Sequence, residues 1–164
     1  MRDRLPDFDL DTYLPYRLTV IAARLSTELS QQYKKQFDIT IPEWRVILNL
    51  GYSGVSSVRD IEKRVSLEKS KASRAVTRLE AKGYLTKTVD ETDRRLLKLA
   101  LTEKGADLLA QLIPLAIDYR TRLEAALGDQ MGPLQAALDC LEARDDDARR
   151  PTDPVQSRRD PSCK

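Results

Sequence analysis

The sequence predicts a mainly helical fold with one small β-hairpin. Apolar residues recur every three or four positions through most of the 164 residues, which is the spacing of amphipathic helices. Two short runs, 85–89 and 96–101, read instead as strands, and they enclose a polar turn over 90–95, as in a hairpin. Aromatic residues make up 5% of the chain and charged residues 33%, which suits helices with long polar faces better than a sheet sandwich.

The first third of the chain predicts two helices. Residues 1–11 are charged and interrupted by a proline, so we expect a flexible N-terminus. A long amphipathic helix follows over about 13–37, and its apolar stripe is long enough that part of it should pack on a second copy of the chain. Thr40 and Glu43 have the spacing of a capping box with a proline between them, which predicts a helix over 41–50.

A helix-turn-helix is predicted next. Residues 51–54 form an expected turn, and Ser57 with Asp60 resembles another helix start. The short helix that begins there should end near Val65. After a connection over 66–69, a further helix is expected to run from about Glu68 to Lys82.

The helix that ends near Lys82 has two different faces, whose members are Ala72, Val76, Leu79 and Gly83 on the apolar side, and Ser70, Lys71, Arg74, Thr77 and Arg78 on the basic side. Gly83 can stop the helix, and the hairpin follows at once. A helix that leads directly into a basic hairpin is typical of a winged helix, which reads the major groove of DNA with the helix and touches phosphates or the minor groove with the hairpin. A merely solvated basic surface gives the same helix pattern.

The last third of the chain predicts two more helices and a tail. Thr102 is the expected N-cap of a long helix over 103–127, which Pro114 should bend rather than end. A final helix is expected over 129–144. Asp, Arg, Pro and Ser dominate after it, so we expect a disordered tail over 145–164.

Charge and composition narrow the function. The net charge is +2, but residues 41–105 carry 14 basic and 9 acidic side chains, which indicates a polyanion-binding surface. No apolar run has the ~18 residues of a membrane span, and no signal-like apolar core follows the N-terminus, so a cytoplasmic protein is expected. The absence of histidine removes His-based catalysis and most zinc sites. We therefore expect no enzyme, no metal and no cofactor.

The hairpin carries a recognisable motif, formed by Asp93, Arg95, Leu99, Leu101, Thr102 and Gly105. It resembles the D-x-R-x-x-x-L-x-L-T-x-x-G signature of the MarR family of bacterial transcriptional regulators. The resemblance extends to residues 70–85 and, more loosely, over 12–143. It implies a single domain over 12–144, in which dimerisation helices over 12–37 and 103–144 flank a winged-helix DNA-binding lobe over 41–102.

The residues expected to contact DNA are Ser70, Lys71, Ser73, Arg74, Thr77, Arg78, Lys82, Lys87, Asp93, Arg94 and Arg95. Arg74 can grip the O6 and N7 atoms of guanine, at ~1–3 kcal/mol of discrimination for a good pair, while Arg78 and Lys82 should hold the backbone. The resemblance implies that Arg95 enters the minor groove and that Asp93 orients it. A salt bridge at the wing tip without a DNA role is the alternative.

The resemblance also implies a small-molecule effector. The residues expected near the ligand crevice of the family are Tyr13, Tyr16, Arg17, Trp44 and Arg45, and their rings and cations suit an aromatic acid, a phenolic compound or an acyl thioester. For Trp44 the sequence favours a core position over a ligand contact, and the two arginines can form intersubunit ion pairs. Cys140 is expected to be a small buried residue, and Cys163 lacks the cationic surroundings of a sensor thiol.

The sequence thus predicts a homodimeric winged helix-turn-helix regulator, expected to repress from a pseudo-palindromic operator and to be released by a small ligand. Two alternatives remain. A winged helix that holds another protein would show no sequence preference for DNA. A constitutive DNA-binding regulator would lack the effector.

Overall fold

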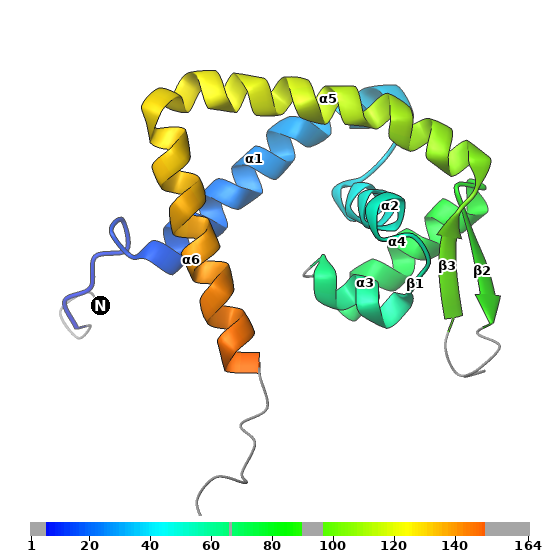
Figure 1. Ribbon diagram of the computed structural model, residues 1–164, viewed down its shortest axis with the longest axis horizontal. Coiled ribbons are helices and arrows are strands. Elements are labelled where there is room, and N and C mark those ends of the chain that lie inside the picture. The colour runs from blue at the N-terminus through cyan, green and yellow to red at the C-terminus, as the bar shows by residue number, and fades with distance from the viewer. Residues whose placement is uncertain (1–5, 66, 90–96, 150–164) are drawn as a thin grey trace, which may run out of the picture. The chain divides into compact units, whose positions relative to one another are not determined.

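The chain folds into two compact units, residues 1–120 and 121–164. The computed structural model describes residues 6–65, 67–89 and 97–149 (Figure 1). The elements of the first unit are α1 (Leu14–Phe37), α2 (Ile41–Ser53), β1 (Ser56–Ser57), α3 (Val58–Arg64), α4 (Lys69–Ala81), β2 (Leu85–Val89), β3 (Leu97–Leu101) and most of α5 (Glu103–Leu127). The second unit holds the end of α5, the 3-10 helix η2 (Gly128–Gln130) and α6 (Met131–Arg149). Within the described ranges, no helix is both long and apolar enough to cross a membrane.

The predicted helices are confirmed, and most of them begin where local capping places them. The Thr40 hydroxyl and backbone amide both donate to the Glu43 carboxylate, which completes the predicted capping box of α2. At the start of α3, the amide of Asp60 donates to the Ser57 hydroxyl at 3.1 Å. The hydroxyl of Ser57 donates in turn to the Asp60 carboxylate and lowers its pKa.

Two expected boundaries are wrong. The turn expected over 51–54 is shorter, because α2 continues to Ser53 and the chain reverses at Gly54, whose φ of 68° favours glycine. The last helix was expected to end near residue 144, but α6 runs to Arg149. An Asp-rich segment without large apolar residues can still continue a helix that has already started, because extension costs far less than nucleation.

The predicted hairpin is part of a three-stranded antiparallel sheet in the order β1-β3-β2. Leu85 pairs with Leu101 and Val89 with Leu97, so the two predicted strands run antiparallel side by side. The third strand, β1, was not predicted. It has only two residues, too few for an alternating pattern, and pairs Ser56 with Leu99.

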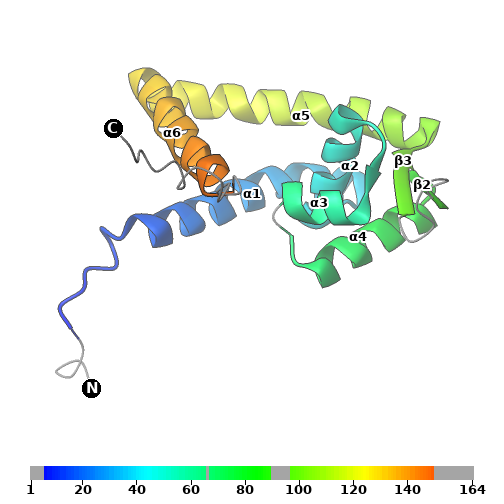
Figure 2. The same cartoon turned by 60° about the horizontal axis from the view of Figure 1, so that its bottom comes forward.

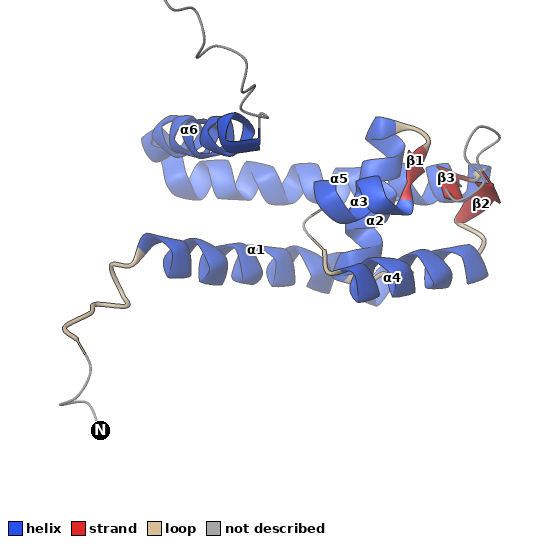
Figure 3. Cartoon of the chain, turned by 90° about the horizontal axis from the view of Figure 1, so that it is seen from below, coloured by secondary structure: helices blue, strands red, loops and turns tan. Residues whose placement is uncertain are grey.

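The apolar face of α4 packs into one core with α2, α3 and the sheet. The buried members of this core include Tyr33, Ile39, Ile47, Ile61, Val76, Leu79, Leu85, Leu99 and Leu112. Figure 2 shows α3 and α4 as consecutive helices, and Figure 3 shows the strands gathered beyond the C-terminal end of α4. The core therefore holds the helix-turn-helix and the base of the wing as one body.

The end of α4 and the start of α5, which are separated in the sequence by the hairpin, are hydrogen-bonded to each other. Gly83 has a φ of 74° and closes α4, as predicted. The Thr102 amide donates to the Tyr84 carbonyl at 3.1 Å, and the Thr102 hydroxyl donates to the Gly83 carbonyl at 2.7 Å. The amide of Gly105 donates to the same hydroxyl at 3.0 Å, so Thr102 caps α5 as expected.

Gly105 allows this joint to close. A Cβ at this position would lie 1.9 Å from the Tyr84 carbonyl oxygen, which is backbone and cannot rotate away. We therefore expect Gly105→Ala to lower the free energy of unfolding by about 3 kcal/mol, at the upper end of overpacking costs. Gly132→Ala is the matched control, since no atom lies within 4 Å of its added Cβ. Urea denaturation should show Gly132→Ala unchanged or slightly more stable, and equal effects of the two changes would contradict the steric account.

Candidate nucleic-acid interface

The polar side of α4 is a continuous exposed face. Ala72, Ala75, Val76 and Leu79 are buried, which fixes how the helix is turned. The exposed residues opposite them are Ser70, Lys71, Ser73, Arg74, Thr77 and Arg78. The division between an apolar and a basic face is therefore the one that the sequence predicts, and the basic face is accessible along the whole helix.

Arg74 and Lys71 are held by their own helix. The Nε of Arg74 donates to the Ser70 carbonyl at 3.1 Å, one turn earlier. Lys71 Nζ lies 3.3 Å from the Glu68 carboxylate, but both side chains are more than half exposed, so this ion pair is weak. Either cation can exchange such a contact for a DNA base or phosphate at little cost.

A hollow of about 380 Å³ lies between the start of α2 and the basic face of α4. Its lining consists of Thr40, Pro42, Lys71, Arg74, Ala75 and Arg78. Three of these six side chains are cations, and no carboxylate lines the hollow. The first turn of α2 therefore borders the basic face of α4, which the sequence did not indicate.

Three cations expected to touch the DNA backbone already have carboxylate partners in the chain. Lys82 Nζ lies 3.0 Å from the Asp38 carboxylate and also donates to the Asp38 carbonyl. Lys87 Nζ lies 2.5 Å from Glu80. Arg78 Nε lies 3.1 Å from Glu43. Of the three, Arg78 keeps the most exposed side chain, at 53%.

Lys82 fixes the sharp turn between α1 and α2. Asp38 there has a φ of 52°, a left-handed conformation that Asp tolerates better than most residues. The hydrogen bond and the charge of Lys82 lower the pKa of the Asp38 carboxyl below its ordinary value of 3.8. Lys104 donates to the Lys82 carbonyl at 2.8 Å, and its ammonium lies 4.8 Å from the centre of the Tyr84 ring. Lys82 thus belongs to a structural junction.

Glu43 is the functional candidate that sequence reasoning missed. Its spacing from Thr40 indicated only a helix cap. In the structure its side chain is 0% exposed, with one oxygen on Thr40 and the other directed at Arg78 and Lys82. Only the tertiary contact between α2 and α4 reveals this second role, and the sole signal in the sequence is the capping box itself.

The tip of the wing, with Asp93, Arg94 and Arg95, lies outside the described residues. The minor-groove role of Arg95 therefore stays a prediction. The two strands that carry the tip are described, and Leu99 of β3 is fully buried in the core.

The structure does not bring the expected ligand residues together within the single chain. Tyr13, Tyr16 and Arg17 are exposed at the start of α1. Trp44 is buried and stacks on Tyr33, with ring centres 5.5 Å apart, at the other end of that helix. Twenty helical residues span about 30 Å, so the two groups cannot share a ligand in one chain.

Arg45 lies with neither group. Its guanidinium donates to the carbonyl of Val65, the C-cap of α3, at 3.3 Å.

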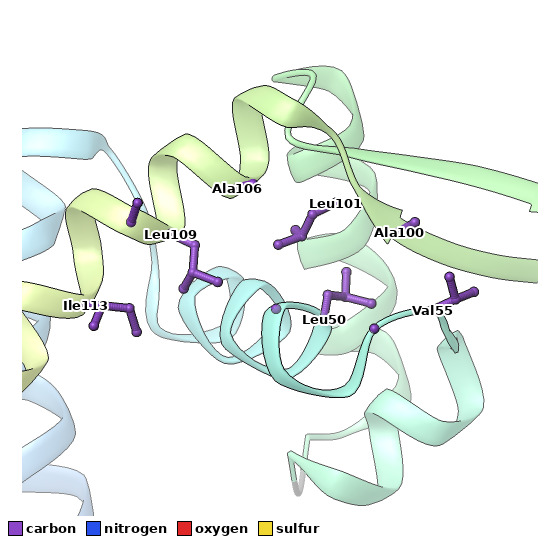
Figure 4. A pocket seen from close by; sticks show the side chains of 10 residues that line it. Leu50, Val55, Ala100, Leu101, Ala106, Leu109 and Ile113 are labelled. Carbon is purple, nitrogen blue, oxygen red and sulfur yellow. The ribbon is translucent and has the colours of Figure 1, made fainter.

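A separate apolar hollow of about 490 Å³ lies between α2, β3 and α5 (Figure 4). Leu50, Val55, Leu101, Leu109 and Ile113 line it together with glycine and alanine residues. No charged side chain lines it, so a ligand there would be held by apolar contact.

The expectation of a buried Cys140 is wrong for the single chain, where Cys140 is exposed on α6. Its helix also exposes Leu134, Leu138 and Leu141, so the apolar positions that suggested burial have no cover in one protomer. In the described part of the chain, no group of His, Cys, Asp or Glu side chains could hold a metal ion.

Comparison with known proteins identifies this winged helix. Residues 37–96 match the model of the MarR family. The transcriptional regulator SarZ of Staphylococcus saprophyticus is 36% identical over 76 residues, which are 46% of this chain and 52% of SarZ. The winged helix of this chain, over residues 37–96, is that of the MarR family. The match spans about half the length of that relative, so the activity of the whole protein is a matter for proposal.

Solved MarR-family structures extend the similarity beyond the winged helix. A MarR/EmrR-family regulator from Acinetobacter sp. ADP1 is 26% identical, with a TM-score of 0.72 over 86% of this chain and 97% of that one. The regulator PcaV of Streptomyces coelicolor, solved with its natural ligand, is 25% identical, with a TM-score of 0.65 over 88% of this chain and 99% of PcaV. The family consists of transcriptional regulators, and this MarR-family chain has the same fold.

Proposed function

We propose that this MarR-family chain is a homodimeric regulator that binds a pseudo-palindromic operator and represses transcription. The exposed basic face of α4, held by a buried apolar face in a helix-turn-helix with a wing, is the observation that carries this proposal. An α-helix fits the major groove of B-DNA, where each base pair presents a distinct pattern of donors and acceptors. The contacts proposed for α4 are Ser70, Lys71 and Arg74 to bases, and Ser73, Thr77 and Arg78 to the backbone.

Exposed apolar residues support a dimer. Leu14 and Ile21 on α1 are 54% and 46% exposed, and Leu134 and Leu138 on α6 are 40% and 41% exposed. Such residues recur along one stripe of each helix, and a second copy would bury them. In a two-fold dimer the two α4 helices would enter successive major grooves about 34–36 Å apart.

The experiment that tests this function is selection of bound duplexes from a random pool at near-physiological salt. We expect an inverted repeat with half-sites about one helical turn apart, because a two-fold dimer reads the same sequence on both strands. Salt must be fixed, since affinity for DNA falls steeply as salt rises. Retention without any enriched sequence would instead favour a winged helix that holds another protein.

Arg74 is the proposed base reader. Arg74→Ala should weaken binding to the selected operator by about 1–3 kcal/mol and relax the sequence preference at one position, because a bidentate arginine contact discriminates by that amount. The control is Arg144→Ala, which removes the same charge from an exposed site on α6. Titration of both variants with the operator and with a scrambled duplex separates the two effects. Equal losses on both duplexes would make Arg74 a phosphate contact.

We further propose that a small ligand releases the operator. PcaV, which shares the fold at 25% identity, was solved with a natural ligand, and this chain has an apolar hollow against α5. A ligand can shift the protein only as far as its affinities for the two states differ. Thermal shift assays with phenolic compounds, aromatic acids and their coenzyme A thioesters should therefore reveal a stabilising compound that also weakens operator binding. Stabilisation by none of them would favour a constitutive regulator.

A further inference from the structure

We propose that Glu43 is a positioning residue, which aims Arg78 at a phosphodiester of bound DNA seated in the hollow between α2 and α4. The proposal rests on the DNA-binding function above and goes beyond it by naming one phosphate site and the buried group that organises it. Arg78 is then a fixed contact rather than one of several mobile surface cations.

Glu43 is itself held rigidly. Its carboxylate is 0% exposed, and its Oε2 accepts hydrogen bonds from the Thr40 amide at 2.7 Å and from the Thr40 hydroxyl at 2.5 Å. Both donors belong to the N-cap of α2, so the carboxylate cannot move unless the first turn of that helix moves. The other oxygen, Oε1, is thereby directed toward α4.

Oε1 is buried and accepts no hydrogen bond. It faces two cations instead, with Arg78 Nε at 3.1 Å and Lys82 Nζ at 4.0 Å. The Arg78 contact is close enough for an ion pair but is not aligned as a hydrogen bond. A buried carboxylate is costly unless it is paired, so Glu43 strongly favours the position in which the Arg78 guanidinium stays beside it.

The guanidinium nevertheless remains available to a ligand. Arg78 is 53% exposed and uses Nε toward Glu43, while a guanidinium has five N–H donors in one rigid plane. The ion pair keeps the guanidinium beside Glu43 and leaves its two terminal nitrogens to a ligand, and two parallel donors match two oxygens of a phosphate. The ammonium of Lys82 is less available to a ligand, because it is paired with the Asp38 carboxylate at 3.0 Å.

The hollow beside Arg78 has the charge that a phosphate needs. Lys71, Arg74 and Arg78 line it, and Thr40 and Pro42 form its other wall. Glu43 is not among the lining residues and is 0% exposed, so a phosphate in the hollow would contact the cations and not this carboxylate. Its volume of about 380 Å³ is ample for a phosphate group with bridging water.

The opposite role for Glu43 would be to neutralise Arg78 and keep it from DNA. The two roles predict effects of opposite sign when the carboxylate charge is removed. If Glu43 holds the Arg78 guanidinium in its binding position, the side-chain entropy is already lost before DNA binds. Removal of the Glu43 charge would then weaken DNA binding. If Glu43 instead neutralises Arg78, removal of the Glu43 charge would make Arg78 bind DNA more tightly.

The test compares Glu43→Gln, Arg78→Ala, the double variant and Arg78→Lys on the selected operator over a series of salt concentrations. Asp38→Asn is the matched control, because it removes a carboxylate from the same junction that does not pair with Arg78. Circular dichroism melting of each variant shows that it is folded at the assay temperature.

We expect Arg78→Ala to weaken binding about tenfold and to reduce the log-log salt slope by about one unit. Glu43→Gln should weaken binding at least about threefold, and the double variant should bind no worse than Arg78→Ala, because the two residues act as a unit. Asp38→Asn should leave the slope unchanged. Tighter binding by Glu43→Gln, or additive losses in the double variant, would overturn the proposal.

Arg78→Lys keeps the charge and leaves Glu43 intact, so it answers the question even if Glu43→Gln does not fold. It should bind as weakly as Glu43→Gln, because an ammonium lacks the rigid fork. Wild-type affinity in this variant would remove the aiming role. If the wild-type protein retains no duplex at all, the DNA-binding function fails first.

Inorganic phosphate, titrated at constant ionic strength, separates DNA from a free anion as the occupant. We expect it not to raise the melting temperature of the wild-type protein. Stabilisation that Arg78→Ala abolishes would mean that the hollow takes free phosphate, and would overturn the assignment to DNA.

Discussion

A fully buried carboxylate sets the arrangement of this winged helix. Glu43 caps its own helix and faces α4 at the same time, so the start of α2 and the recognition helix cannot shift independently. Apolar packing alone tolerates small sliding movements of one helix over another, whereas a buried charge must remain near its cation. The angle at which α4 presents its basic face therefore depends on one polar contact as well as on the core.

The C-terminal end of α4 is also held in place, by its connection to the start of α5. Gly83 ends the helix, and Thr102 ties the following turn to the start of α5. Gly105 lets the Tyr84 carbonyl approach the α5 backbone, which gives the last part of the family signature a structural reason. In this chain Thr102 and Gly105 hold the base of the wing against the end of α4.

Local signals explain why so much of the fold was predictable. Capping boxes at Thr40 and Ser57 and the glycine at position 83 placed the ends of three helices, because each acts within one turn of its own chain. The two-residue β1 carried no such signal. The basic face of α4 was also predictable, since burial of Val76 and Leu79 determines which side is exposed.

Partners distant in the sequence were not predictable. The contact from Lys82 to Asp38 joins the end of α4 to the turn between α1 and α2, and the contact from Arg78 to Glu43 joins α4 to the first turn of α2. Nothing in the local sequence pattern indicates either pairing. This pairing has a consequence for redesign of DNA specificity by exchange of recognition helices. A grafted helix that lacks a cation at position 78 would leave the buried Glu43 oxygen facing only Lys82, 4.0 Å away, so a transplant should keep Arg78 or replace Glu43 with it. Positions 70, 71, 73, 74 and 77 are exposed and face no buried charge, so a combinatorial library of helix-compatible residues can vary them at little cost to the core.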